Sequence, residues 1–384
     1  MTSEKRIKQT LRHIEPDRIP LDLGASVVTG IHIVAYKNLL SYLGIKKPDF
    51  QILLERPQIA KIHKDVLDML KVDAQGLFPN PSSNWRFDVT EDHKYQYFVD
   101  EWGVKWRRPK KNGYYFDVVE NPLRDEVQEK DIDNYPWPDF ADRRRIEGLV
   151  KRAQNLEQEK GRALVLEGPG GEIFDTAFLL RGYENFYVDL ASRPSLACYV
   201  MDKMLELQLQ FWEMALRELK EYVLVVRMGD DLGMQLAPRI SPRMYRKYVK
   251  PRHRKLFSSV KKMAEGRIYI FFHTCGSVYD IIPDLIEVGI DILNPVQVSA
   301  AKMDTKRLKK EFGKELTFWG GTVDTQDVLP HGTPEEVKEE VKRRISDLAP
   351  GGGFVFSPVH NIQYDVPPQN IMAMWEALQE YGVY

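Results

Sequence analysis

From about residue 160 onward, short apolar runs alternate with longer stretches in which apolar positions recur at helical spacing. The runs predict buried strands at Ala163–Leu166, Tyr222–Met228, Ile268–Phe272, Ile290–Leu293, Leu316–Trp319 and Phe354–Phe356. The stretches between them predict helices at Tyr187–Leu219, Pro242–Glu265, Val278–Val288, Lys302–Phe312 and Pro334–Leu348. Earlier in the chain, a helix around Glu55–Leu70 is expected between two more strands, Ile19–Leu23 and Ala74–Phe78. Eight strands alternating with helices predict an α/β fold, the (β/α)8 or TIM barrel.

One segment, Asn84–Asp117, breaks this alternation and predicts two or three strands. A hairpin turn is expected at Asn112-Gly113, between Val104–Arg107 and Tyr114–Asp117. We therefore expect a single barrel domain over residues 1–384, with a hairpin-rich insertion at about 84–140. Its aromatic residues either cover the barrel mouth or form the insertion's own core; they are Trp85, Phe87, Tyr95, Tyr97, Phe98, Trp102 and Trp106.

Composition argues against a nucleic-acid-binding, membrane-spanning or disulfide-rich protein. The net charge is -1, with 55 basic and 56 acidic residues, which predicts no general attraction to nucleic acid or membrane surfaces. Two cysteines in 384 residues exclude a disulfide framework and fit a reducing compartment. No apolar run is long enough for a membrane span. We expect a cytoplasmic protein that acts on a small molecule.

Polar residues follow nearly every predicted strand, where the active sites of such barrels lie. As candidate proton donors or acceptors we take Glu167, Asp230 and Asp231, and as candidate substrate-binding residues Asp22, Asn294 and Gln297. Asp230 and Asp231 could instead cap the following helix. The remaining strand ends carry His273 with Cys275, and His360.

His273, Cys275 and His360 combine imidazole and thiol ligands, a set that favours zinc. Three such ligands would leave an open coordination position, as catalytic zinc requires. Glu167 or one of the paired aspartates could add a fourth ligand or accept a hydrogen bond from an imidazole. A metal-free alternative stays open, in which Asp230, Asp231 and His360 transfer protons by themselves and Cys275 is then a bystander. We expect Cys198 and the remaining histidines, His13, His32, His63, His93, His253 and His331, to be structural or surface groups.

Several stretches resemble the uroporphyrinogen decarboxylase superfamily, and most closely its branch of cobalamin-dependent methyltransferases. The resemblance spans nearly all the chain except Asn84–Trp137. It is carried by Glu15-Pro16-Asp17-Arg18-Ile19-Pro20, Gly229-Asp230-Asp231-Leu232-Gly233, Ser241-Pro242, Lys250-Pro251-Arg252, Phe272-His273-Thr274-Cys275-Gly276, Gly289-Ile290-Asp291, Asn294-Pro295-Val296-Gln297, Trp319-Gly320-Gly321 and Pro367-Pro368-Gln369-Asn370-Ile371.

The resemblance implies zinc at His273 and Cys275, with His360 at the place where the methyltransferases carry a second cysteine. It implies transfer of a methyl group between a small methylated substrate, such as a phenyl methyl ether, and a corrinoid. The chain has no corrinoid-binding Asp-x-His-x-x-Gly, so a partner protein would carry that cofactor. The alternative is a metal-free decarboxylase of porphyrin biosynthesis. Such decarboxylases hold propionates with an Arg-Gln-Ala-Gly-Arg-Tyr segment, whereas the corresponding Leu21–Val28 contains no arginine.

Overall fold

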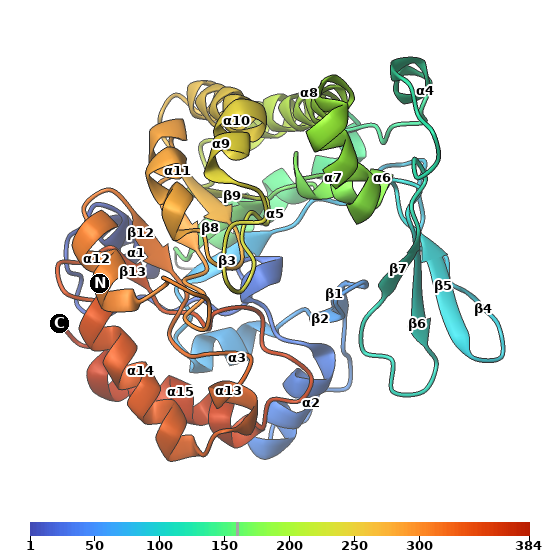
Figure 1. The fold of residues 1–384 in the computed structure, drawn as a ribbon. Coiled ribbons are helices and arrows are strands. Elements are labelled where there is room, and N and C mark those ends of the chain that lie inside the picture. The colour runs from blue at the N-terminus through green and yellow to red at the C-terminus, as the bar shows by residue number, and fades with distance from the viewer. Residues whose placement is uncertain (159–160) are drawn as a thin grey trace.

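The centre of the molecule is a curled sheet of parallel strands, in a computed structural model that describes residues 1–158 and 161–384 (Figure 1). Seven strands follow the order β13-β12-β11-β10-β9-β8-β3, each parallel to its neighbours. They are β3 Ala74–Leu77, β8 Ala163–Glu167, β9 Val225–Gly229, β10 Tyr269–His273, β11 Ile292–Asn294, β12 Thr317–Trp319 and β13 Phe354–Val355. The seven corresponding strand predictions are confirmed.

The eighth predicted strand, Ile19–Leu23, is not formed as a strand. Only Leu21 makes a bridge, parallel to Phe356. Its carbonyl accepts a hydrogen bond from the Asp73 N–H at 2.7 Å, next to β3, while the Phe356 N–H donates to the Pro20 carbonyl at 2.8 Å. This segment therefore connects the two edge strands and makes the sheet barrel-like. Regular pairing stops because Pro20 has no N–H and Gly24 turns the chain at φ 87°.

Helices surround the sheet (Figure 1). They are α1 Ser3–Leu11, α2 Ile33–Tyr42, α3 Lys64–Met69, α4 Glu129–Asp133, α5 Leu149–Gln158, α6 Asp175–Arg181, α7 Tyr183–Ser192, α8 Pro194–Leu219, α9 Pro242–Met244, α10 Lys250–Met263, α11 Ile282–Val288, α12 Thr305–Phe312, α13 Val328–His331, α14 Pro334–Leu348 and α15 Pro368–Tyr381. A π-helical turn, Tyr245–Val249, joins α9 to α10. Within the described ranges, none of these helices is long and apolar enough to cross a membrane.

Two helix predictions need correction. The single helix predicted over Tyr187–Leu219 is split into α7 and α8, because Pro194 disfavours helical geometry at the preceding Arg193. The helix predicted around Glu55–Leu70 is only α3; before it lie two short antiparallel strands, β1 Ile52–Leu54 and β2 Ile59–Ala60. By contrast, α14 has the predicted bounds, since Thr333 and Glu336 form a capping box at its start.

A separate antiparallel sheet stands beside the barrel at the right of Figure 1. Its strands are β4 Thr90–Glu91, β5 Tyr95–Val99, β6 Lys105–Pro109 and β7 Asp117–Glu120, so it has four strands rather than two or three. The strands β6 and β7 pair antiparallel, but residues 110–116 connect them instead of a two-residue turn at Asn112-Gly113. Phe98 and Trp106 stack in this sheet's own core, with ring centroids 6.2 Å apart. Phe98 and Trp106 therefore form the insertion's own core, one of the two roles expected for its aromatic residues.

Strand alternation decides which side chains reach the barrel interior. Val165, Val225, Phe271 and Ile292 belong to one buried cluster inside the sheet, whereas their chain neighbours pack against the helices outside. Because side chains alternate along a strand, the next inward positions are two residues further on. Those positions hold Glu167, Arg227, His273 and Asn294, so charged and polar groups converge at the carboxyl ends of four adjacent strands.

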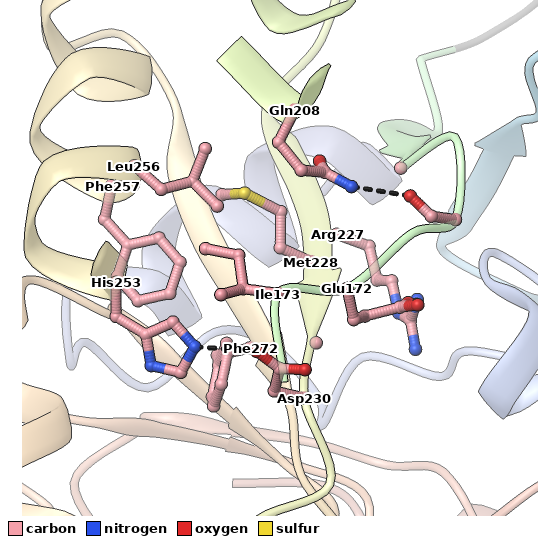
Figure 2. A pocket seen from close by; sticks show the side chains of 13 residues that line it. Glu172, Ile173, Gln208, Arg227, Met228, Asp230, His253, Leu256, Phe257 and Phe272 are labelled. Carbon is pink, nitrogen blue, oxygen red and sulfur yellow. Dashed lines mark hydrogen bonds and ion pairs between the residues drawn. The ribbon is translucent and has the colours of Figure 1, made fainter. Parts of the chain in front are cut away.

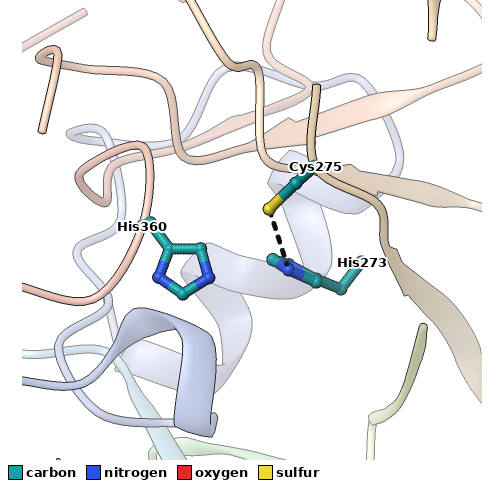
Figure 3. A group of neighbouring side chains, drawn as sticks. All are labelled: His273, Cys275 and His360. Atoms are coloured by element: carbon teal, nitrogen blue, oxygen red, sulfur yellow. Dashed lines mark hydrogen bonds between the residues drawn. The ribbon is translucent and has the colours of Figure 1, made fainter. Parts of the chain in front are cut away.

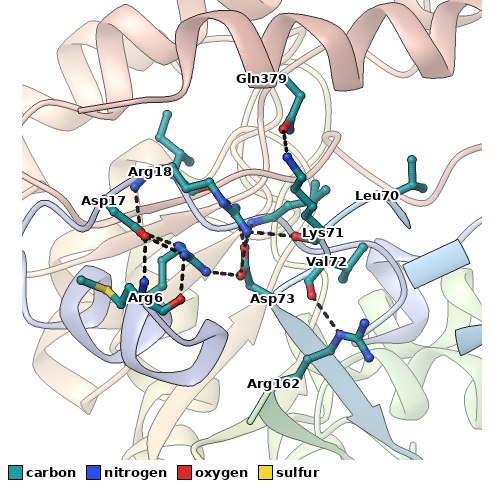
Figure 4. A network of polar contacts seen from close by, with 12 residues as sticks. Arg6, Asp17, Arg18, Leu70, Lys71, Val72, Asp73, Arg162 and Gln379 are labelled. Atoms are coloured by element: carbon teal, nitrogen blue, oxygen red, sulfur yellow. Dashed lines mark hydrogen bonds and ion pairs between the residues drawn. The ribbon is translucent and has the colours of Figure 1, made fainter. Parts of the chain in front are cut away.

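The opposite end of the barrel is held by a buried ion network (Figure 4). The carboxylate of Asp73, which is inaccessible to solvent, accepts hydrogen bonds at 2.7 Å from Arg6 of α1 and from Arg18. Arg6 also pairs with Asp17 at 2.7 Å. Charge-assisted hydrogen bonds of this kind compensate the desolvation of Asp73 and connect α1 to β3.

A candidate metal centre

Three side chains from two strand ends converge at the carboxyl edge of the sheet. His273 is the last residue of β10, Cys275 follows two residues later, and His360 lies in the loop after β13 (Figure 3). Each offers one ligand atom, and these atoms all lie within 4.8 Å of one another. The Cys275 Sγ is 3.4 Å from the His273 Nε2, and the two imidazole centroids are 5.3 Å apart. Residues 85 positions apart in the chain thus form the predicted group of three.

Both imidazole rings are held by their Nδ1 atoms. The Asn294 Oδ1 accepts a hydrogen bond from the His273 Nδ1 at 2.5 Å, and the Asn294 Nδ2 donates to the Trp319 carbonyl at 2.7 Å. The His360 Nδ1 likewise donates to the Asn361 Oδ1. A ring that donates through Nδ1 keeps a lone pair on Nε2, which is the arrangement seen in metal-binding histidines. Asn294 was predicted to bind substrate; its side chain here orients His273.

The donor set and its protonation fit zinc. Burial lowers the pKa of His273 to about 3 and also lowers the pKa of His360, so both rings are neutral and can coordinate a cation. Burial, reinforced by Asp231, raises the pKa of the Cys275 thiol. A metal at this site would therefore displace the thiol proton on binding. Two imidazoles and one thiolate would supply three of the four ligands that tetrahedral zinc takes.

An acidic pair borders these three residues. The Asp231 Oδ1 accepts a hydrogen bond from the Cys275 N–H at 2.8 Å and lies 3.7 Å from the His273 Nε2. The Asp175 Oδ2 in turn accepts from the Asp231 N–H at 2.8 Å, and its Oδ1 pairs with Arg239 at 2.5 Å. Burial and then the charge of Asp231 raise the pKa of Asp175 to about 8. Burial acts in the same direction on Asp231, but His273 and the Cys275 amide outweigh it and lower the pKa of Asp231.

Asp175 and Arg239 were not predicted from the sequence as residues of the site. Asp175 opens α6, eight residues beyond the end of β8, and Arg239 lies in the loop before α9, so neither occupies a strand-end position. Asp231 lies beside the group of three as expected. The only sequence signal for Asp175 was an acidic residue in the first turn of a short helix after Gly168-Pro169-Gly170-Gly171.

The carboxylate of Asp230 is occupied by donors from the protein itself. It accepts hydrogen bonds from the Phe174 and Asp175 N–H groups at 2.8 Å and from the His253 Nε2 at 2.8 Å. Figure 2 shows His253, on α10, directed at this carboxylate. Asp230 therefore holds the start of α6, where Asp175 lies, and a direct role for it in proton transfer remains a prediction. His253, expected to be structural or on the surface, is a buried structural group.

Glu167 is engaged in an ion network inside the barrel. Its Oε2 accepts from the Val27 N–H at 3.0 Å, and its Oε1 lies 3.1 Å from the Arg227 guanidinium, which also pairs with Glu172 at 3.0 Å. Burial raises the pKa of Glu167. The sequence did contain a signal for Arg227, because an arginine within the apolar run Tyr222–Met228 needs a buried partner.

The other two predicted substrate-binding residues also bond to the protein itself. The Asp22 Oδ2 accepts from the Trp319 Nε1 at 2.8 Å, and burial raises the pKa of Asp22 to about 6. The Gln297 Oε1 accepts from the Gly276 N–H at 2.6 Å and thereby steadies the loop that follows Cys275. Contact between either residue and a substrate remains a prediction.

Comparisons with known proteins agree on a family. A family model described as "Uroporphyrinogen decarboxylase (URO-D)" matches residues 100–381. The uroporphyrinogen decarboxylase of Psychromonas ingrahamii is 22% identical over 282 residues, which cover 71% of this chain and 74% of that protein. A methylated-thiol–coenzyme M methyltransferase of Methanosarcina mazei is 26% identical over 141 residues, 37% of this chain and 34% of the methyltransferase. The solved structure of a methyltransferase from Methanosarcina mazei covers 99% of both chains with a TM-score of 0.68 at 20% identity, a likeness of fold.

Proposed function

The chain belongs to the uroporphyrinogen decarboxylase (URO-D) family, and we propose that within this family it is a zinc-dependent methyltransferase. The observation that carries the proposal is the convergence of His273, Cys275 and His360, with both imidazoles presenting Nε2. A zinc ion held by these residues would act as a Lewis acid on an ether oxygen or thiol sulfur of the substrate.

The residues around the centre supply the proton that methyl removal requires. When a methyl ether loses its methyl group, the leaving oxygen carries a negative charge that must be neutralised. Asp175, whose pKa burial raises to about 8 in the metal-free protein, accepts a hydrogen bond from the Asp231 N–H and is the proposed donor of this proton. Arg239 keeps Asp175 in place, and the ionised Asp231 fixes the Cys275 backbone.

The proposed methyl acceptor or donor is a corrinoid carried by a partner protein, and the proposed small substrate is a methylated compound such as a phenyl methyl ether. The methyltransferase relative from Methanosarcina mazei supports methyl transfer, and by its name it acts on methylated thiols. Decarboxylation of a porphyrinogen is the competing activity within the family. It is disfavoured because residues 21–28 contain no arginine and the carboxylate of Asp22 is occupied by Trp319 and Ala25.

Metal analysis tests the proposal. Protein purified without a polyhistidine tag should contain about one zinc per chain, which Cys275→Ala should lose. Cys198→Ala is the matched control, because Cys198 lies on α8 against the helix–sheet core and should leave the zinc content unchanged. The zinc-loaded protein should then transfer methyl groups from a phenyl methyl ether to a reduced corrinoid protein.

Two results would overturn this function. The first is a protein that binds no zinc on reconstitution although it is folded. The second is a metal-free protein that converts uroporphyrinogen to coproporphyrinogen, which would establish the decarboxylase instead.

A further inference from the structure

The connection between β6 and β7 packs against the loop that carries His360. The rings of Tyr114 and Tyr364 stack with centroids 3.8 Å apart and an interplanar angle of 11°. Tyr115 lies edge-on to His32, with centroids 5.5 Å apart, and 6.0 Å from Tyr364. The connection between β6 and β7 therefore contacts the barrel beside the candidate metal centre.

A chain of hydrogen bonds runs from this contact to His360. The Tyr115 hydroxyl donates to the Gln363 Oε1. The Gln363 Nε2 donates to the Asn361 Oδ1 and to the Asn361 carbonyl, both at 3.0 Å. The same Oδ1 accepts from the His360 Nδ1. The side chains of Tyr115, Gln363 and Asn361 thus link the connection between β6 and β7 to an imidazole of the centre.

The two histidines differ in how they are anchored. The acceptor for His273 is Asn294, which lies on the neighbouring strand β11 and is fixed by the Trp319 carbonyl of β12. The acceptor for His360 is Asn361, the next residue in the same loop, outside any strand. An acceptor on a loop orients a ring only if the acceptor is itself held. Gln363 and Tyr115 provide that support.

We propose that Tyr115 is a positioning residue for His360, acting through Gln363 and Asn361; this inference rests on the proposed zinc site. Groups that orient a metal-binding histidine contribute to metal affinity although they do not touch the metal. The antiparallel sheet would then contribute to the geometry of the centre and would do more than stand beside it.

The test compares two neighbouring tyrosines. Tyr115→Phe removes the hydroxyl but keeps the ring contacts. Tyr114→Phe is the matched control, because among the described residues the Tyr114 side chain has ring contacts and its hydroxyl makes no hydrogen bond. Zinc affinity is measured by competition with a chromophoric chelator, and ligand geometry by the visible absorption of the cobalt(II)-substituted full-length protein.

We expect Tyr115→Phe to weaken zinc binding by roughly twofold to tenfold, the range of one neutral hydrogen bond, and to alter the cobalt spectrum. Asn361→Leu should cost about tenfold to a hundredfold, and Asn361→Asp, which retains the acceptor, should recover most of that loss. In the Asn361→Leu background, Tyr115→Phe should have no further effect, because the chain of hydrogen bonds is already broken.

Unchanged affinity and spectrum in Tyr115→Phe would overturn the inference, as would equal losses in Tyr114→Phe or an independent loss in the double variant. The affinity of the unsubstituted protein reports separately on the proposed zinc site. If that protein binds zinc and Tyr115→Phe binds it equally well, only the positioning role fails. If the unsubstituted protein binds no zinc, the proposed function fails, and the positioning role fails with it.

Discussion

Asp175→Asn should change how the stability of the metal-free protein depends on pH. In the folded protein the pKa of Asp175 is raised from 3.8 to about 8, first by burial and then by the charge of Asp231. The folded state therefore binds this proton more tightly than the unfolded state between pH 4 and 8. By linkage, the contribution of Asp175 to the free energy of unfolding falls as the pH rises through that window. Asparagine cannot ionise, so the variant should lack this fall.

The pKa shift of Asp175 sets an upper bound on the change in unfolding free energy, and its surroundings make the expected change smaller. Each pH unit between the two pKa values corresponds to about 1.4 kcal/mol, so the bound is about 6 kcal/mol. The Asp175 side chain is 26% exposed and pairs with Arg239, and the lowered pKa of Asp231 acts in the opposite direction. Because the two carboxyl groups titrate as a pair, we expect the variant to gain about 2–3 kcal/mol relative to the unsubstituted protein between pH 5 and 9.

Urea unfolding at several pH values, with a chelator present, measures this difference directly. The control is Asp88→Asn, the same substitution at an exposed aspartate in the segment before β4, which shows what the change of residue type does by itself. Zinc should shift the window to lower pH, because a nearby dication favours the ionised carboxylate. A difference for Asp175→Asn that is constant from pH 5 to 9, or that shrinks as the pH rises, would refute the reasoning.

Two further predictions concern stability. Asp73→Ala leaves the buried guanidinium of Arg6 with one partner fewer. We expect urea titrations to show an unfolding free energy lower by about 3–5 kcal/mol. A loss below about 1 kcal/mol would mean that Arg6 and Arg18 find other partners. Zinc at 100 times its dissociation constant should add about 2.7 kcal/mol, seen by calorimetry as a higher Tm that a chelator reverses. Cys275→Ser should abolish that rise and Cys198→Ser should retain it, and a rise that persists in Cys275→Ser would place the zinc elsewhere.

The strands of the barrel could be predicted from the sequence because burial on both faces produces continuous apolar runs. Seven runs, such as Ile268–Phe272, became strands of the curled sheet. The exception, Ile19–Leu23, has the right composition, but Pro20 and Gly24 limit its pairing to Leu21. Apolar composition reports burial, and it does not report whether backbone hydrogen bonds continue on both sides.

The grouping of the three central side chains could be predicted from the sequence, but their supporting residues could be predicted only in part. His273 ends a strand and Cys275 and His360 follow strands, and strand ends meet at one edge of a parallel sheet. Asn294 ends a strand too, yet its side chain accepts a hydrogen bond from His273. Whether a polar side chain at the edge faces a ligand or a neighbour depends on side-chain directions, which sequence position does not specify. Asp175 was missed for a related reason, since Asp230 brings it to the centre from outside any strand end.

The position of His360 shows why prediction of the strands does not give the whole site. The sheet alone is enough to place His273, because its Asn294 partner lies one strand away in register, with His273 opposite Asn294. His360 is on a loop, and its support comes from Tyr115, 248 positions before Gln363 in the chain. Contacts at such separation leave no local sequence pattern, so the sequence left open whether this segment covers the barrel mouth or only forms its own core. If the tyrosine variants behave as expected, the orientation of His360 in its loop depends on Tyr115. The connection between β6 and β7 and the barrel would then form one site together.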